Sequence, residues 1–358
     1  MIGNKAKYKL LSVTLAIVMT FALFPAAAAA EDPTAYNIGD GSIAINAAGA
    51  YVISGTSTSN TITVAKDIDV QITLDNVNID VSAKMWSCAF RVADDSTGDV
   101  SITLMGENVL KSGYNCAGLQ KSGSGDDIGT LTIGGEGSLQ AVGGSSGAGI
   151  GGGLSRSGSN IVITGGANVT ASGGNSGAGI GGGATGAGSN ITITGDAVVV
   201  ANGGASGAGI GGGSSLGGNQ ITISGNAHVT ATGGPAGAGI GGGFGGAGSF
   251  IIISENAEVQ ATGGTGYGGG VSGGAGIGGG QNASGNNITI SGGDITANGG
   301  NQAAGIGGGF DGSSDTIEIS GGTVIATGGF SGAGIGGGCS GNAIRVTIKD
   351  DAYVQATG

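Results

Sequence analysis

The sequence has few basic residues, few prolines and a single histidine. Only 11 Lys and Arg stand against 23 Asp and Glu among 358 residues. A surface this negative repels nucleic acid and anionic membrane, so we expect neither as a partner. With three prolines and no strict Gly-X-Y period, the 88 glycines do not predict a collagen helix.

Groups that could carry catalysis are equally scarce. His228 is the only histidine, and other repeats have Asn168, Val198, Glu258 or Tyr353 at the same outward position. No Ser/His/Asp set, zinc cluster or acid/base pair of carboxylates can be built around it. The only arginines, which a lyase would need as a base, are Arg91, Arg156 and Arg345. The sequence therefore predicts a protein that is not an enzyme.

Residues 1–30 have the pattern of a secretory signal peptide. Three lysines precede an apolar stretch over residues 10–24, and an alanine run over residues 26–30 offers a cleavage site before Glu31. An uncleaved membrane anchor is the alternative. No second long apolar run follows, so we expect a secreted or extracellular protein that leaves the membrane after cleavage.

A glycine-rich motif recurs along the chain. The sequence Gly-Ala-Gly-Ile-Gly-Gly-Gly, degenerate in its sixth copy, repeats at intervals of 30, 30, 30, 37, 29 and 29 residues. An insert around residues 265–272 accounts for the longest interval. The central isoleucines are Ile150, Ile180, Ile210, Ile240, Ile277, Ile306 and Ile335. A period of this length is typical of a solenoid.

Each repeat contains three extended pieces. In one repeat, Ile161 and Ile163, then Val169 and Ala171, are apolar residues two positions apart and share one face of a strand. The motif itself is the third piece, with Ile180 on its inner face. We predict an all-β, right-handed parallel β-helix with three short strands per coil of about 29–30 residues. An antiparallel sandwich would explain the alternation but not the period.

The regularity of the chain changes near its middle. We expect a signal peptide over residues 1–30, less regular β-helix coils with acidic loops over residues 31–143, and the glycine-rich repeat helix over residues 144–358. Weaker matches to the three pieces extend backwards from the motif array. They predict that the β-helix starts near residue 40.

Two cysteines occupy matching places in successive coils. Cys88 and Cys116 are 28 residues apart, and stacking would bring their Cα atoms within the range of a disulfide. We predict that bond, with two buried free thiols as the alternative. Cys339 has no matching partner.

Acidic residues cluster in the corners of the front coils. The candidate metal ligands are Asp94, Asp95, Asp99, Asp126 and Asp127. If stacking brings these corners together, their carboxylates suit Ca²⁺. Solvated turn residues are the alternative.

Two segments resemble known proteins. The sequence Tyr51-Val52-Ile53-Ser54-Gly55-Thr56 and the stretch from Val70 to Ile79 resemble the opening coils of secreted bacterial carbohydrate-binding β-helix proteins. The resemblance covers residues 45–140 and implies a pectate-lyase-like fold that binds acidic plant polysaccharide with calcium and lacks lyase activity. The motif array over residues 144–358 resembles glycine-rich repeat regions of large bacterial surface proteins and is far poorer in acids.

These features favour a non-catalytic carbohydrate-binding module or adhesin segment whose partner is a polysaccharide or cell-wall glycan. The candidate sugar-binding residues are Trp86, Tyr114, Thr232, Thr262 and Asn298. A flat strip of outward glycines is a second candidate surface, unless the glycines serve only tight packing. The alternative function is a structural stalk, with a further chain or domain capping the C-terminal end. A polysaccharide lyase and an ice-binding protein are less favoured.

Overall fold

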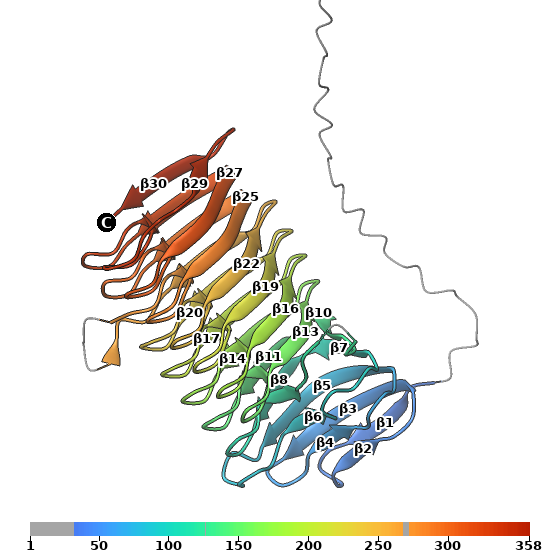
Figure 1. Cartoon of the computed structure of the whole chain (residues 1–358). Coiled ribbons are helices and arrows are strands. Elements are labelled where there is room, and N and C mark those ends of the chain that lie inside the picture. The colour runs from blue at the N-terminus through green and yellow to red at the C-terminus, as the bar shows by residue number, and fades with distance from the viewer. Residues whose placement is uncertain (1–31, 126, 268–271) are drawn as a thin grey trace, which may run out of the picture. The chain divides into compact units, whose positions relative to one another are not determined.

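The computed structural model describes residues 32–125, 127–267 and 272–358. The predicted signal peptide and Asp126 lie outside the described residues. The chain from Pro33 onward forms one compact unit in which the coils follow one another in chain order (Figure 1). None of the described segments is a helix with the length and hydropathy needed to span a membrane.

One sheet is built from the motif strands, which pair in parallel from coil to coil. Each strand in the motif array has only two residues. The members are β2 (Ile43–Ile45), β4 (Ile62–Val64), β6 (Phe90–Val92), β9 (Leu119–Lys121), β12 (Ile150–Gly151), β15 (Ile180–Gly181), β18 (Ile210–Gly211), β21 (Ile240–Gly241), β24 (Ile277–Gly278), β26 (Ile306–Gly307) and β28 (Ile335–Gly336).

The second sheet holds the other two strands of each coil, again paired in parallel with the neighbouring coils. First strands are β1 (Thr34–Asn37), β3 (Gly49–Ser57), β5 (Val70–Asp80), β7 (Val100–Met105), β10 (Leu131–Gly135), β13 (Gly158–Ile163), β16 (Gly188–Ile193), β19 (Gly218–Ile223), β22 (Gly248–Ile253) and β29 (Val346–Ile348). Second strands are β8 (Glu107–Lys111), β11 (Ser138–Val142), β14 (Asn168–Ser172), β17 (Val198–Asn202), β20 (His228–Thr232), β23 (Glu258–Thr262) and β30 (Tyr353–Thr357). Long strands β25 (Gly285–Asn298) and β27 (Ser314–Thr327) cover both positions, as do β3 and β5 in the front coils, because β3 pairs with β5 along its length and the end of β5 pairs with β8.

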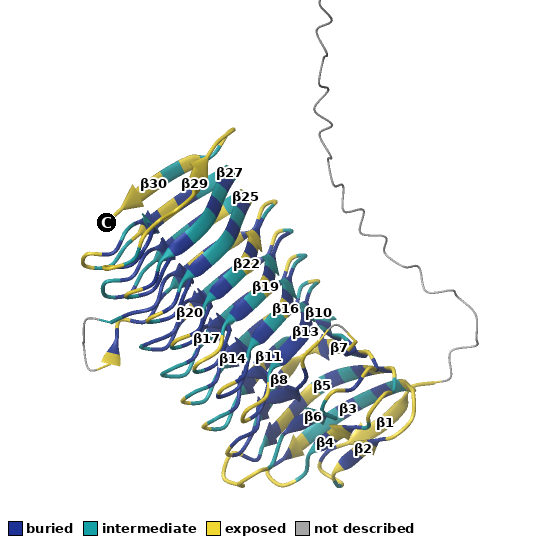
Figure 2. Cartoon of the chain, viewed as in Figure 1, coloured by how far each residue is buried: buried dark blue, intermediate teal, exposed yellow. Residues whose placement is uncertain are grey.

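The predicted parallel β-solenoid is confirmed, and its core is the stacked aliphatic face. Ile150, Ile180 and Ile210 are direct Cα partners across successive coils and are fully buried. Buried and partly exposed positions alternate along the inner strands, whereas β1 and β30 at the two ends of the described unit are largely exposed (Figure 2). The last coil therefore leaves Val346 and Ile348 exposed, whereas the first coil still buries Ile43 and Ile45.

The glycine strip does not face solvent, which corrects one of the two binding surfaces considered from the sequence. Gly149 and Gly151 are buried. A Cβ on Gly149 would lie 2.6 Å from the carbonyl oxygen of Gly179, so another side chain has no room there. Gly151 has a φ of 126°, a conformation that favours glycine. These glycines let the motif corners pack backbone against backbone.

The front of the solenoid also begins earlier than the sequence predicted. Strand β1 pairs with β3 from Thr34 onward, ahead of the expected start near residue 40. The residues of β1 are all exposed, so it lacks the buried alternation by which the later coils are recognised. A parallel pairing, rather than an apolar pattern, incorporates this segment.

Candidate functional site

The described residues include a groove of about 510 Å³ on the outer face of the second strands. It crosses five successive coils, from β17 to the second half of β27. The outward side chains that line it are Val198, Val200, His228, Thr230, Glu258, Gln260, Asp294, Thr296, Thr323 and Ile325. Their direction follows from strand alternation, because Val229 and Ala231 between them point into the core and are buried.

The middle of the groove is polar on three consecutive coils. The outward columns run His228–Glu258–Asp294 and Thr230–Gln260–Thr296, and a third column of Thr232, Thr262 and Asn298 adjoins them. Each position in this three-by-three array carries a side chain that donates or accepts hydrogen bonds. We call these residues the polar block.

A close contact between His228 and Glu258 lies at the edge of the polar block. His228 Nδ1 lies 2.9 Å from Glu258 Oε2, and both side chains are more than half exposed. Asp294 stands directly beside Glu258 on the next coil. The lining contains no Lys or Arg. The block therefore offers neutral donors and acceptors together with two carboxylates, which suits neutral or cationic ligands better than acidic ones.

The two ends of the groove are apolar. Val198 is 39% exposed and Ile325 is 40% exposed, and these residues lie on the coils that border the polar block. A concave surface with converging polar groups and apolar margins is typical of ligand-binding sites. The groove is thus the strongest candidate site in the described part of the chain.

The structure separates the predicted sugar-binding residues into two groups. Thr232, Thr262 and Asn298 are neighbours in one column of the polar block. Trp86 and Tyr114 lie on front coils and are both exposed. The backbone N–H of Trp86 donates to the carbonyl oxygen of Tyr114 over 3.3 Å. The sequence pattern alone did not indicate as ligand-binding the neighbouring residues of the block, which are His228, Thr230, Glu258, Gln260, Asp294 and Thr296. Their outward alternation at one-coil spacing was the available signal.

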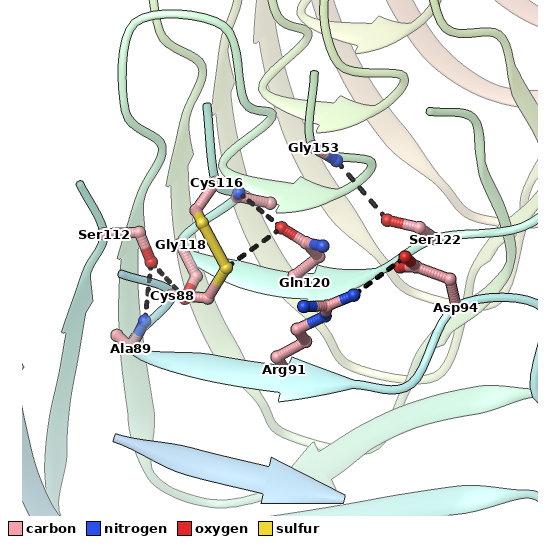
Figure 3. The surroundings of a disulfide bond; sticks show 11 residues. Cys88, Ala89, Arg91, Asp94, Ser112, Cys116, Gly118, Gln120, Ser122 and Gly153 are labelled. Atoms are coloured by element: carbon pink, nitrogen blue, oxygen red, sulfur yellow. Dashed lines mark hydrogen bonds and ion pairs between the residues drawn. A yellow bond between two sulfur atoms is a disulfide. The ribbon is translucent and has the colours of Figure 1, made fainter. Parts of the chain in front are cut away.

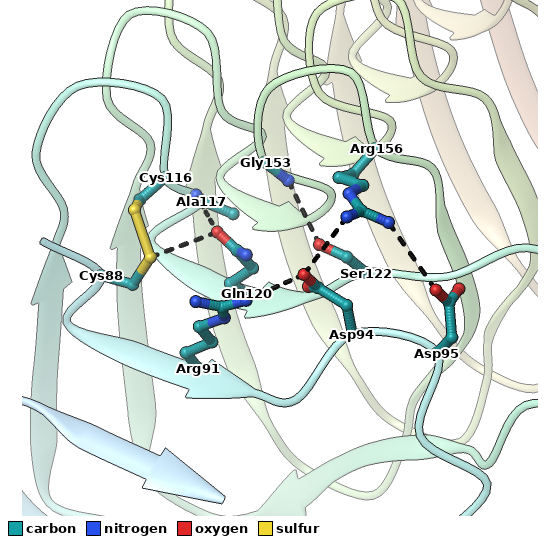
Figure 4. Close-up of polar contacts among 10 residues, drawn as sticks. All are labelled: Cys88, Arg91, Asp94, Asp95, Cys116, Ala117, Gln120, Ser122, Gly153 and Arg156. Carbon is teal, nitrogen blue, oxygen red and sulfur yellow. Dashed lines mark hydrogen bonds and ion pairs between the residues drawn. A yellow bond between two sulfur atoms is a disulfide. The ribbon is translucent and has the colours of Figure 1, made fainter. Parts of the chain in front are cut away.

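The acidic corner is built around arginines instead of a ring of acids. Asp94 Oδ2 lies 2.8 Å from Arg91 and 3.7 Å from Arg156, which also lies 3.7 Å from Asp95 (Figure 4). The backbone of Asp95 bonds to Ser122 on the next coil, so this corner stacks on Ser122. The two carboxylates thus already face positive charge, which disfavours a nearby cation.

Other front-half carboxylates cap the next coil. The backbone N–H of Thr130 donates to Asp99 Oδ1 over 2.7 Å, and the N–H of Thr97 donates to Asp67 over 2.9 Å. The latter bond lowers the pKa of Asp67. Asp127 is exposed. Within residues 32–125, 127–267 and 272–358, no three His, Cys, Asp or Glu side chains group as metal ligands. Calcium binding stays a prediction.

Cys88 and Cys116 form a disulfide between successive coils, with their Cα atoms 5.2 Å apart (Figure 3). Gln120 Oε1 lies 3.3 Å from Cys88 Sγ and accepts the N–H of Ala117. Cys339 is exposed and free, as its lack of a matching residue predicted. The bond fixes the spacing of two coils that lack the glycine motif.

The front coils also contain a buried lysine that the sequence pattern did not indicate. Lys121 occupies the inward position held by Val92 one coil earlier, and only 2% of it is exposed. Its Nζ donates to the carbonyl oxygen of Ser159 over 2.8 Å. Burial lowers the pKa of Lys121 to about 8, against the opposing effect of Asp99 and Asp95. The burial of Lys121 could not be predicted, because no sequence pattern distinguishes a lysine in an apolar column from one on the surface.

Comparison with known proteins agrees with the coil architecture. Five segments match the Beta helix repeat family model, at residues 161–184, 191–214, 221–244, 288–310 and 317–339. Each matched segment runs from a first strand through a second strand to a motif strand. No curated protein and no solved structure matches the chain. The matched repeats and the parallel coils together make this chain a β-helix repeat protein.

Proposed function

We propose that this chain is a secreted, non-catalytic protein of the bacterial cell surface that binds a polysaccharide along the groove, as a carbohydrate-binding module or adhesin segment. The observation that supports this proposal most strongly is the polar block, in which outward hydrogen-bonding side chains lie in register on three consecutive coils. A repeating ligand is the natural complement to a surface that repeats from coil to coil.

The chemistry of the groove favours a neutral glycan. Thr230, Gln260 and Thr296 can each donate to and accept from sugar hydroxyls. Val198 and Ile325 at the margins can contact the apolar faces of sugar rings. The described residues that line the groove include no Lys or Arg, so the groove lacks the charged donors that bind uronate or sulfate groups most strongly. We therefore expect neutral chains to bind in preference to the acidic plant polysaccharide of the resembling family.

A matched pair of double variants tests the groove. Thr230→Ala with Thr296→Ala removes two hydroxyls from the polar block. Thr222→Ala with Thr289→Ala removes two hydroxyls from first strands on the same two coils. All four threonines are half-buried and outward, so both variants should fold alike.

The measurement is binding to an array of neutral and acidic glycans, with and without calcium. We expect the wild-type protein and the first-strand variant to bind the same neutral glycans, and the groove variant to bind them about tenfold more weakly. Equal binding by the two variants would place the ligand elsewhere. Binding that appears only with calcium would instead favour a metal-dependent site.

The alternative is a structural spacer, which an unbroken ladder of apolar side chains favours. The same inward column continues from Ile62 through Phe90 and Leu119 to Ile335. A spacer needs this stiffness and no ligand. Failure of the wild-type protein to bind any glycan on the array, in either calcium condition, would favour the spacer over the binding module.

A further inference from the structure

The front coils carry several exposed apolar side chains on adjacent motif loops, whereas the later motif loops expose them singly, as at Leu216 and Phe330. Four large side chains there are exposed: Met85 by 68%, Trp86 by 63%, Tyr114 by 47% and Leu154 by 39%. They lie next to the motif strands β6, β9 and β12 of three successive coils. In the next three coils the positions of Tyr114 and its following residue hold Ser145 and Ser146, Asn175 and Ser176, and Ala205 and Ser206, whereas Phe330 takes the position of Tyr114 in the last motif coil and is 80% exposed.

Trp86 is held in a conformation that its residue type disfavours. Its φ is 63°, in the left-handed region, where a bulky residue costs about 1 kcal/mol or more. Its largely exposed ring recovers little of this cost by packing in the core. The same corner position also has a positive φ at Asn115, Gln302 and Ser331, so the conformation belongs to the corner, and among these residues Trp86 alone carries a bulky ring there.

Cross-coil bonds fix Trp86 and Tyr114 relative to each other. The backbone N–H of Trp86 donates to the carbonyl oxygen of Tyr114. The backbone N–H of Gly113 donates to the carbonyl oxygen of Ser87 over 2.8 Å. The Cys88–Cys116 disulfide lies two residues beyond each aromatic residue. Figure 3 shows it linking the two coils, beside the bond from the N–H of Ala89 to Ser112 Oγ. The two aromatic residues are thus pinned at one-coil spacing.

The third column of the polar block, which adjoins the groove, leads to this corner along the direction in which the coils stack. The third column of the polar block extends back through the second strands to the two coils that carry Trp86 and Tyr114. Its members are Asn298, Thr262, Thr232, Asn202, Ser172, Val142, Lys111 and Asp80. Lys111 Nζ lies 3.7 Å from Asp80 Oδ2, so a polar pair stands directly before the aromatic corner. A long chain that follows this column would reach both places.

We propose that Trp86 and Tyr114 form a platform for the apolar faces of pyranose rings, and that the Cys88–Cys116 disulfide is the positioning element that holds it. The inference rests on the proposed function, because its ligand is the same neutral polysaccharide. Exposed aromatic rings bind sugars through their faces, while polar neighbours such as Asp80 and Lys111 engage the hydroxyls. Rigid spacing raises affinity because less freedom is lost on binding.

Trp86 makes the proposal directly measurable, because it is the only tryptophan in the chain. Purified protein is titrated with neutral hexasaccharides of cellulose, xylan, mannan and chitin, and binding is followed by tryptophan fluorescence and by calorimetry. We expect a blue shift of the emission with the hexasaccharide that binds, because a stacked sugar excludes water from the ring. Without the disulfide, in Cys88→Ser with Cys116→Ser, the affinity should fall several-fold.

Trp86→Gly is a variant whose loss of affinity could not be explained by misfolding. Glycine suits a φ of 63°, so thermal stability should be equal or higher, while calorimetric affinity falls about tenfold. If Trp86→Gly and the disulfide variant bind as tightly as the wild-type protein, the platform is overturned. When only the groove variant loses affinity, the proposed function stands without the platform. A protein that binds none of the hexasaccharides overturns both.

Discussion

The front coils, over residues 33–143, and the repeat coils, over residues 144–358, share one core and differ in how their corners are held. The column that follows the inward motif residue shows the difference. It reads Thr63, Arg91, Gln120, Gly151 and Gly181 from coil to coil. Where the column turns to glycine, the corners close by backbone contact. Where it carries side chains, individual contacts replace that packing.

Those individual contacts are varied in kind. The front coils use the Cys88–Cys116 disulfide, the ion pairs of Arg91 and Arg156, and aspartate caps such as Asp99. The repeat coils use one solution many times, with glycines at a φ of 126° to 139° beside the motif isoleucine. The solenoid core thus holds the coils in register in both regions, while the residues at the corners can differ from coil to coil. Function can therefore differ between the two regions.

The shared core gives the largest expected effect. Ile210→Ala in a repeat coil and Leu119→Ala in a front coil remove fully buried side chains from one inward column. Each should lower the free energy of unfolding by about 2–5 kcal/mol, as measured by denaturant unfolding. Ile252→Ala is the control, because Ile252 is 42% exposed and should change stability by about 0.5 kcal/mol or less. A small effect at Ile210 would mean that this strand is inside out.

The corner column separates the two regions more sharply. Gly181→Ala should cost about 3 kcal/mol, because its φ is 127° and a Cβ would lie 2.1 Å from the carbonyl oxygen of Gly211. Gln120→Ala in the same column should cost only about 1 kcal/mol, the value of its hydrogen bond to Ala117. Gly134→Ala, where a Cβ would meet only ordinary contacts, serves as a control near zero. Equal losses at Gly181 and Gln120 would remove the distinction between the regions.

The disulfide tests the same difference between the two regions by a change in the front coils. Reduction, or Cys88→Ser with Cys116→Ser, should cost about 2–3 kcal/mol, because the bond closes a loop of 28 residues. Hydrogen exchange should show the loss of protection in the front coils, while β15 to β24 keep theirs, since coils contact mainly their neighbours. Uniform loss of protection along the chain would show that the two regions unfold as one.

Most of the fold followed from the sequence, because stacked coils repeat their pattern. The isoleucine interval predicted the coil length, and alternation within Ile161–Val162–Ile163 predicted which side chains are buried. The candidate site was predicted only in part. Thr232, Thr262 and Asn298 could be aligned from the sequence, as could His228, Glu258 and Asp294, but the alignment did not indicate the groove that the second set lines. Of the arginine partners of Asp94, Arg91 is only three residues away, whereas Arg156 lies on a later coil, where no local pattern indicates it.

Lys121 offers the smallest effect and the one most specific to the front coils. Its pKa is about 8 when folded and near 10.5 when unfolded, so between these pH values the unfolded chain holds more protons. The free energy of unfolding should therefore rise as the pH increases from about 8 to above 10.5. Lys121→Met fills the same inward column without a charge and should remove this rise. It should stabilise the protein by about 1–2 kcal/mol below pH 8, less the value of the bond to Ser159. A pH profile shared by Lys121→Met and the wild-type protein would show that the lysine is solvated, and that the front core is more open than its burial indicates.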